Sequence, residues 1–82
     1  MNLFKTKLFY AAITVKDTET DYALKILDKH KATHVEVSDH GYLPGTKISY
    51  LTTKRKNRRI MKDLQYYRVK ILDVTTNTNE IF

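Results

Sequence analysis

The residues with the clearest chemical potential are the cations of one short segment. Residues 54–62 contain six Lys or Arg side chains and no acid. Arginine makes paired hydrogen bonds to phosphate and stacks on bases, and lysine adds a point charge. A polyanion, most simply RNA, is therefore the expected ligand. The candidate nucleic-acid-binding residues are Lys54, Arg55, Lys56, Arg58, Arg59 and Lys62, with Tyr66 or Tyr50 as candidate stacking groups.

The placement of these cations conflicts with local folding preference. Ile60, Leu64 and Tyr67 recur at helical spacing and predict a helix over residues 56–67. Cations at the start of a helix are opposed by the macrodipole and by one another, although exposed amides there favour phosphate. At helical spacing, Arg55, Arg59, Lys62 and Tyr66 share a face turned away from the apolar residues. Such conflict is typical of a functional surface.

The net charge of +6 is concentrated in one part of the chain. Residues 47–70 carry nine cations and one acid, whereas residues 1–46 carry six Lys and six acids. One alternative is a solvated helix face that keeps a small protein soluble. A membrane surface is a weaker alternative, because the segment lacks Trp and Phe and its apolar side is needed by the core.

The three histidines offer a second, weaker chemistry. His30 and His34 are four residues apart, but one ends a predicted helix and the other begins a predicted strand, so they do not share a helical face. A histidine at a helix C-terminus is also explained by the dipole. A small ribonuclease using His40 is conceivable, since it needs only proton transfer and an oxyanion clamp. We expect no metal site, no cofactor and no catalysis.

Length and composition place these residues in one domain, residues 1–82, with a polar tail over residues 75–82. There is no cysteine, so neither disulfides nor thiolate zinc sites can support the fold, and the cytoplasm is the expected location. The longest apolar run, residues 8–15, is far shorter than the twenty or so residues that span a bilayer.

The elements that position the basic segment follow from hydrophobic periodicity. Residues 8–15 predict a central strand, and residues 18–31 predict a helix with Thr18 and Asp21 as a capping box and Tyr22, Ala23, Ile26 and Leu27 as its apolar positions. Residues 33–39 alternate, with Val35 and Val37 on one face, and residues 47–53 alternate as well. Residues 39–45 predict a hairpin turn between these strands, and residues 68–74 predict the last strand.

This order predicts an α+β, ferredoxin-like βαββαβ fold with two helices on one face of a four-stranded antiparallel sheet. The opposite face would carry Leu8, Tyr10 and Ala12. An open face with an aromatic side chain invites a partner, and a homodimer is an equally weighted use of it.

The element order resembles ferredoxin-like RNA-binding domains, although neither 8–15 nor 47–53 reproduces their glycine-aromatic signature. The short, basic, Lys-, Thr- and Tyr-rich chain also resembles phage accessory proteins, which include anti-defence proteins such as TifA-type inhibitors of ToxN-like toxin ribonucleases. Only residues 53–67 carry this resemblance, so no functional residue is transferred. It implies a host nuclease as partner and the host cytoplasm as location.

The sequence therefore predicts a non-catalytic RNA-binding protein of low sequence specificity. The alternative is a phage-encoded toxin inhibitor that docks its basic helix on a host nuclease or another acidic-surfaced protein, with or without RNA.

Overall fold

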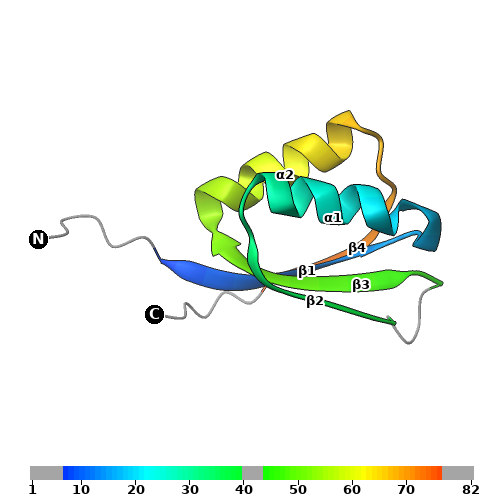
Figure 1. Ribbon diagram of the computed structural model, residues 1–82, viewed down its shortest axis with the longest axis horizontal. Coiled ribbons are helices and arrows are strands. Elements are labelled where there is room, and N and C mark those ends of the chain that lie inside the picture. The colour runs from blue at the N-terminus through cyan, green and yellow to red at the C-terminus, as the bar shows by residue number, and fades with distance from the viewer. Residues whose placement is uncertain (1–6, 40–43, 77–82) are drawn as a thin grey trace, which may run out of the picture.

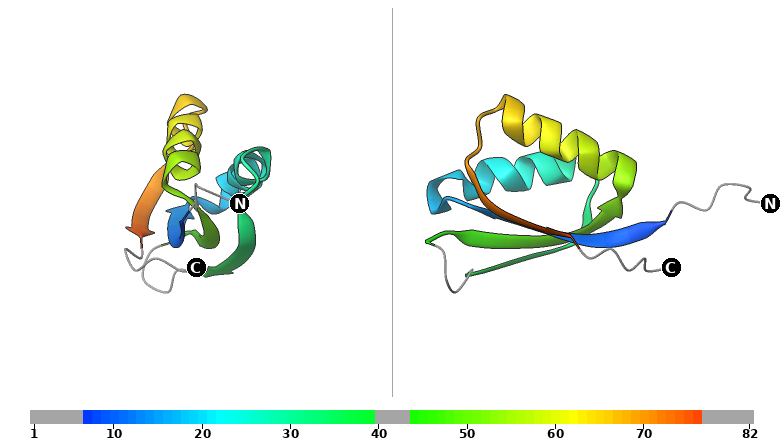
Figure 2. Two further views of the ribbon diagram at one scale, coloured as in Figure 1. Left: turned by 90° about the vertical axis from the view of Figure 1, so that its left-hand side faces the viewer. Right: turned by 180° about the vertical axis from the view of Figure 1, so that it is seen from behind.

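The computed structural model describes residues 7–39 and 44–76 and confirms the predicted ferredoxin-like fold. Four antiparallel strands form one sheet in the order β2-β3-β1-β4, and both helices lie on one side of it (Figures 1 and 2). The elements are β1 (Leu8–Val15), a 3-10 turn (Asp17–Glu19), α1 (Thr20–Lys29), β2 (Thr33–Asp39), β3 (Thr46–Thr53), α2 (Lys54–Tyr66) and β4 (Ile71–Thr76).

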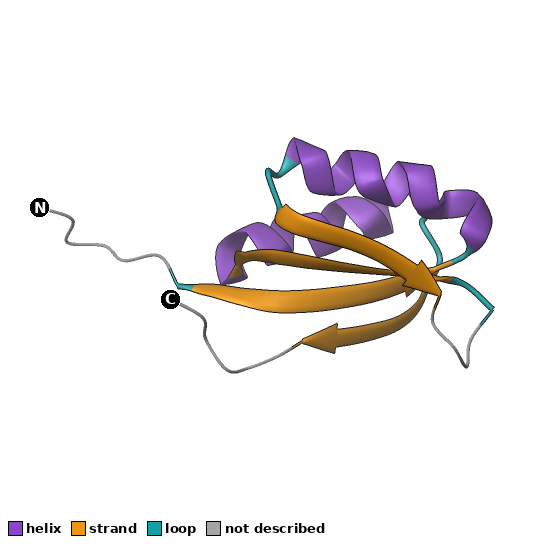
Figure 3. Ribbon diagram, turned by 60° about the horizontal axis from the view of Figure 1, so that its bottom comes forward, coloured by secondary structure: helices purple, strands orange, loops and turns teal. Residues whose placement is uncertain are grey.

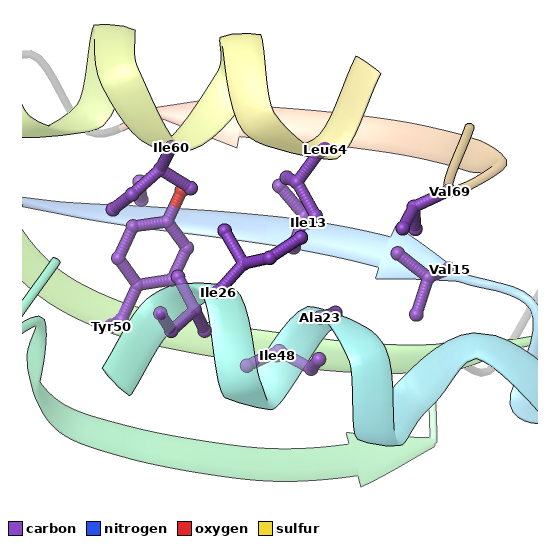
Figure 4. Packing of buried hydrophobic residues seen from close by; sticks show 11 residues of the cluster. Ile13, Val15, Ala23, Ile26, Ile48, Tyr50, Ile60, Leu64 and Val69 are labelled. Carbon is purple, nitrogen blue, oxygen red and sulfur yellow. The ribbon is translucent and has the colours of Figure 1, made fainter. Parts of the chain in front are cut away.

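The two central strands supply the floor of the core, as predicted for β1. Ala11, Ile13 and Val15 alternate along β1, and Ile48 and Tyr50 lie beside them on β3 with their side chains buried. These side chains meet the apolar sides of both helices (Figure 4). The buried cluster is completed by Ala23, Ile26 and Leu27 of α1, Ile60 and Leu64 of α2, and Val69.

Both helices end in the same way. Lys31 follows α1 and Arg68 follows α2, and each has a left-handed φ of 58°. The amide of Ala32 donates to the carbonyl of Leu27 at 3.0 Å, and the corresponding bond after α2 measures 2.9 Å. This is the Schellman motif, which satisfies carbonyls at a helix end but normally uses glycine.

The start of α1 differs from the prediction. The capping box of Thr18 and Asp21 is wrong, because α1 begins after Glu19, which makes no side-chain capping hydrogen bond. Asp17, in the 3-10 turn before α1, makes a tertiary contact instead. The hydroxyl of Thr46, at the start of β3, donates a hydrogen bond to Asp17 Oδ1 at 2.6 Å.

The last strand begins later and ends later than predicted. Residues 68–74 were expected, but β4 runs over Ile71–Thr76 because Arg68 closes α2 and Val69 turns into the core. Thr75 and Thr76 therefore belong to the sheet rather than to a tail. Residues 77–82 lie outside the described part of the chain.

β2 is the main exception to the predicted burial pattern. It was expected to bury one face through its valines, yet all seven of its residues are exposed, with Val35 at 40% and Val37 at 51%. β2 is an edge strand, and no residue of it belongs to the buried cluster. Tyr22 and Tyr67 were also expected to pack, but they are 62% and 53% exposed.

The hairpin between β2 and β3 is confirmed by their antiparallel pairing, which ends at Asp39 opposite Thr46. Residues 40–43 of the predicted turn lie outside the described ranges. Gly45 sits so close to β1 that a Cβ there would lie 2.5 Å from the carbonyl oxygen of Val15. A side chain at this position would force β1 and the hairpin apart.

Within the described ranges, no helix has the length and apolar character needed to cross a membrane.

Candidate nucleic-acid interface

The basic segment forms the first turns of α2. The helix begins at Lys54, two residues earlier than predicted, because the side chain of Thr53 caps it by accepting a hydrogen bond from the amide of Lys56 at 3.1 Å. The first turn contains no acid. Lys54, Arg55 and Lys56 therefore occupy the positions where the helix dipole is least favourable to cations.

The cations of α2 lie on the side that faces away from the sheet. Ile60 and Leu64 are fully buried beneath the helix, and burying each stabilises the fold by roughly 2 kcal/mol. The opposite side carries Arg55, Arg59, Lys62 and Tyr66, which we call the basic face; Lys54, Lys56 and Arg58 flank it, and all seven side chains are exposed. The predicted separation between a packed apolar side and an exposed basic side is therefore present.

None of the six cations forms an ion pair with another residue of the described chain. The one acid of α2, Asp63, turns toward α1 instead. Its Oδ2 accepts from Lys29 Nζ at 3.1 Å and lies 2.7 Å from His30 Nε2. The hydrogen bond with His30 and the one from Lys29 lower the pKa of Asp63, and the same carboxylate raises the pKa of Lys29.

A buried tyrosine fixes the start of α2 on the sheet. Tyr50 rises from β3 through the core towards α2 (Figure 4), and its hydroxyl donates to Asn57 Oδ1 at 2.6 Å. Burial raises the pKa of Tyr50 above its ordinary range, so the hydroxyl stays protonated and remains a donor. The suggestion that Tyr50 stacks on bases is wrong, because its side chain is fully buried.

The other candidate stacking group is accessible. Tyr66 is 76% exposed and lies at the C-terminal end of the basic face. Its ring meets the ring of Tyr67 edge to face, with centroids 5.0 Å apart and planes at 89°. At this exposure, much of the Tyr66 side chain is accessible to a stacking base.

The histidines do not converge on one site in the described chain. His30 is held by Asp63, His34 lies in β2, and His40 falls outside the described residues. Residues 7–39 and 44–76 contain no group of three side chains suited to hold a metal ion.

Sequence reasoning missed the two residues that orient α2, Asn57 and Asp63. One signal was available: Asp63 is the single acid among nine cations in residues 47–70. Its lysine and histidine partners, however, come from a helix more than thirty residues away in sequence, and no local pattern links them.

No family model matches the chain, and no curated protein matches it. Several solved structures share its fold. CPII, a nitrogen regulatory PII-like protein from Thiomonas intermedia K12 bound to ADP, AMP and bicarbonate, is 12% identical, with a TM-score of 0.72 over 93% of this chain and 93% of that one.

Two further solved structures with a similar fold come from proteins of other kinds. The C-terminal domain of the MgtC protein from Mycobacterium tuberculosis is 8% identical, with a TM-score of 0.67 over 94% of this chain and 92% of that one. A Bacillus cereus protein related to NIF3 is 15% identical, with a TM-score of 0.59 over 98% of this chain but 27% of that one. At these identities the likeness establishes the fold alone.

Proposed function

We propose that this protein is a non-catalytic RNA-binding module that contacts phosphates through the basic face of α2. The observation that carries the proposal is the contrast on that helix. Six cations are exposed and have no ion-pair partner in the described chain, while the one acid is occupied by α1. A surface evolved only for solubility is expected to interleave the two signs of charge.

The geometry of the basic face suits a phosphate backbone. From Arg55 to Tyr66 the helix rises about 16 Å, which is long enough to lie along several nucleotides. Arg55 and Arg59 can each bind a phosphate through two hydrogen bonds, and Lys62 adds a point charge. Tyr66 then offers a ring to an unpaired base at the end of the face.

The energetics of the helix start also support an anionic ligand. Each cation in the first turn destabilises the helix by about 0.3–1 kcal/mol at low salt, because it adds to the positive end of the dipole. A bound phosphate reverses this repulsion and accepts from the free amides. RNA binding is therefore expected to stabilise the folded protein as well as to neutralise it.

Sequence specificity is expected to be low. The cations reach phosphates, which are the same in every sequence, and only Tyr66 is placed to touch a base. Stacking on a tyrosine discriminates weakly among bases, since every base presents a π-face.

The test measures the binding of fluorescent single- and double-stranded RNA and DNA across a salt series. For single-stranded RNA and four to six phosphate contacts, we expect a slope of log K against log salt of roughly −3 to −4. The double variant Arg55→Glu/Arg59→Glu is expected to weaken binding about a hundredfold or more and to reduce the slope. Arg55 lies in the first turn of α2, where Glu is favourable, and Arg59 is an exposed residue of the next turn, so this variant should still fold.

The matched control is Lys16→Glu/Lys25→Glu, which makes the same change in net charge at two exposed cations away from α2. It should weaken binding much less. Equal losses in both variants would mean that only net charge matters and would reject the basic face as the site.

If neither RNA nor DNA binds at low salt, the proposal of nucleic-acid binding is rejected, and a protein becomes the expected partner of the basic face. Pull-downs after nuclease treatment would then be expected to recover an acidic-surfaced protein, such as a toxin nuclease, and the recovery should be lost in Arg55→Glu/Arg59→Glu.

A further inference from the structure

The sheet face opposite the helices contains a hollow that is independent of the basic face. No helix of the described chain covers this face, and Figure 3 shows its strands in front of both helices. The hollow has a volume of about 280 Å³. We call it the open-face hollow; it is lined by Tyr10, Ala11, Ala12, His34, Glu36, Ser49 and Thr75.

The strand register explains why the hollow exists. Ala12 of β1 pairs with Ser49 of β3 on one side and with Thr75 of β4 on the other, and Ser49 pairs with Glu36 of β2. These four residues form a row across the sheet, with the smallest side chains in the middle. Tyr10, two positions along β1 from Ala12, rises on the same face and forms a wall.

A bulge in β2 brings His34 into this hollow. The pairing of β2 with β3 shifts register between Thr33 and Glu36, and His34 adopts a left-handed φ of 53°. A non-glycine residue in this conformation is strained. Lys31 and Arg68 adopt the same conformation where a helix ends, whereas at His34 it is part of the bulge, and bulges often redirect a side chain at a functional site.

The polar groups of the hollow are free to meet a ligand. Glu36 and His34 form no hydrogen bond or ion pair through their side chains with any other residue of the described chain. Both are exposed, so a ligand can reach them without unfolding any element. The hollow thus combines a free carboxylate, a free imidazole, two hydroxyls and an aromatic ring around a small floor.

We propose that the open-face hollow binds a guanine base. A carboxylate has two oxygens that accept two parallel hydrogen bonds. Among the common bases, guanine alone presents two adjacent N–H donors, at N1 and at the exocyclic amino group. Adenine, cytosine and uracil each present an acceptor beside their donor, which a carboxylate repels. Glu36 therefore selects guanine, while Tyr10 and His34 provide planar surfaces beside a ring that rests on Ala12.

The test titrates the purified protein with guanosine, adenosine and inosine and follows backbone amide shifts by NMR. These nucleosides carry no phosphate, so the cations of the basic face have no phosphate to bind. Stacking of a base on Tyr66 would shift amides at the end of α2 and would not depend on Glu36, so the two sites are distinguished by where the shifts occur. Saturable shifts are expected around Ala12, Glu36 and Ser49. Guanosine should bind at least about tenfold more tightly than adenosine, because the second charged hydrogen bond is lost with adenosine. Inosine, which keeps N1–H but lacks the amino group, should fall between them.

Two variants separate recognition from folding. Glu36→Gln should abolish the preference for guanosine, whereas Asp39→Asn removes the same charge from the same strand but on the helix-facing side, opposite Thr46, and should leave the preference unchanged. His34→Gly relieves the left-handed backbone while removing the imidazole. It should raise the urea midpoint and weaken guanosine binding, and a lower midpoint would indicate a structural role for His34 instead.

A second copy of this chain is the competing occupant of the face. Sedimentation would then show a concentration-dependent dimer, and guanosine would produce no shifts in the hollow; that result would overturn the proposal. Equal affinity for guanosine and adenosine, or shifts confined to other surfaces, would overturn it as well.

Discussion

α2 and β2 both present polar, exposed surfaces, but they are held in opposite ways. α2 is fixed from its inner side by two fully buried side chains, by the Tyr50–Asn57 hydrogen bond, and by the contact of Asp63 with α1. β2 buries none of its seven residues and is held by its pairing with β3.

This difference shows where each element can tolerate an unfavourable feature. The cations at the start of α2 oppose the helix dipole, but burial on the inner side outweighs them. The strain at His34 lies in an edge strand outside the core, where a register shift disturbs no packed side chain. The helix anchored in the core thus carries the cluster of cations, and the exposed edge strand carries the bulge.

The largest expected contrast comes from deleting side chains in the two elements. Leu64→Ala in α2 should lower the free energy of unfolding by about 2–5 kcal/mol, because it leaves a cavity in the core. Val37→Ala in β2 should lower it by less than about 1 kcal/mol, since Val37 is 51% exposed. Urea unfolding measures both. Similar losses would show that β2 is covered by a partner in solution.

A smaller effect should follow from removing the buried hydroxyl that orients α2. Tyr50→Phe leaves Asn57 Oδ1 without its donor and should lower the free energy of unfolding by about 1 kcal/mol at neutral pH.

The difference in stability between the original protein and Tyr50→Phe should become smaller at alkaline pH. Because burial raises the folded-state pKa of Tyr50, its protonated form contributes fully below the unfolded pKa of about 10 and loses that contribution as the pH rises towards the folded value. Urea midpoints at pH 8 and pH 11 for the original and Tyr50→Phe would check this. A constant difference would mean that the hydroxyl does not titrate differently on folding.

The smallest expected effect concerns the contact between the helices. Partnership with His30 and Lys29 lowers the folded-state pKa of Asp63, so this carboxylate stabilises the fold above its unfolded pKa of about 4 and less so as the pH falls. The urea midpoint of the original protein should therefore drop more between pH 6 and pH 3 than that of Asp63→Asn. Asp28→Asn, at an exposed carboxylate on α1, is the control and should behave like the original.

The amino-acid sequence by itself determined the architecture and the location of the charge. β1 was predicted with its observed bounds, because seven of its eight residues are β-branched, aromatic or small, and a short run of this kind favours a strand. The periodicity of α2 was also sufficient to separate Ile60 and Leu64 from the cations, since one helical face must pack.

Only the tertiary structure decided which polar and aromatic side chains are used internally. Tyr50 and Tyr66 look equally available in the sequence, but one lies beneath α2 and the other at its exposed end. The exposure of β2 followed from its place at the sheet edge, where alternation no longer implies burial. The open-face hollow depends on the register of four strands, which joins Ala12, Ser49 and Glu36 across distances in sequence that no local pattern encodes.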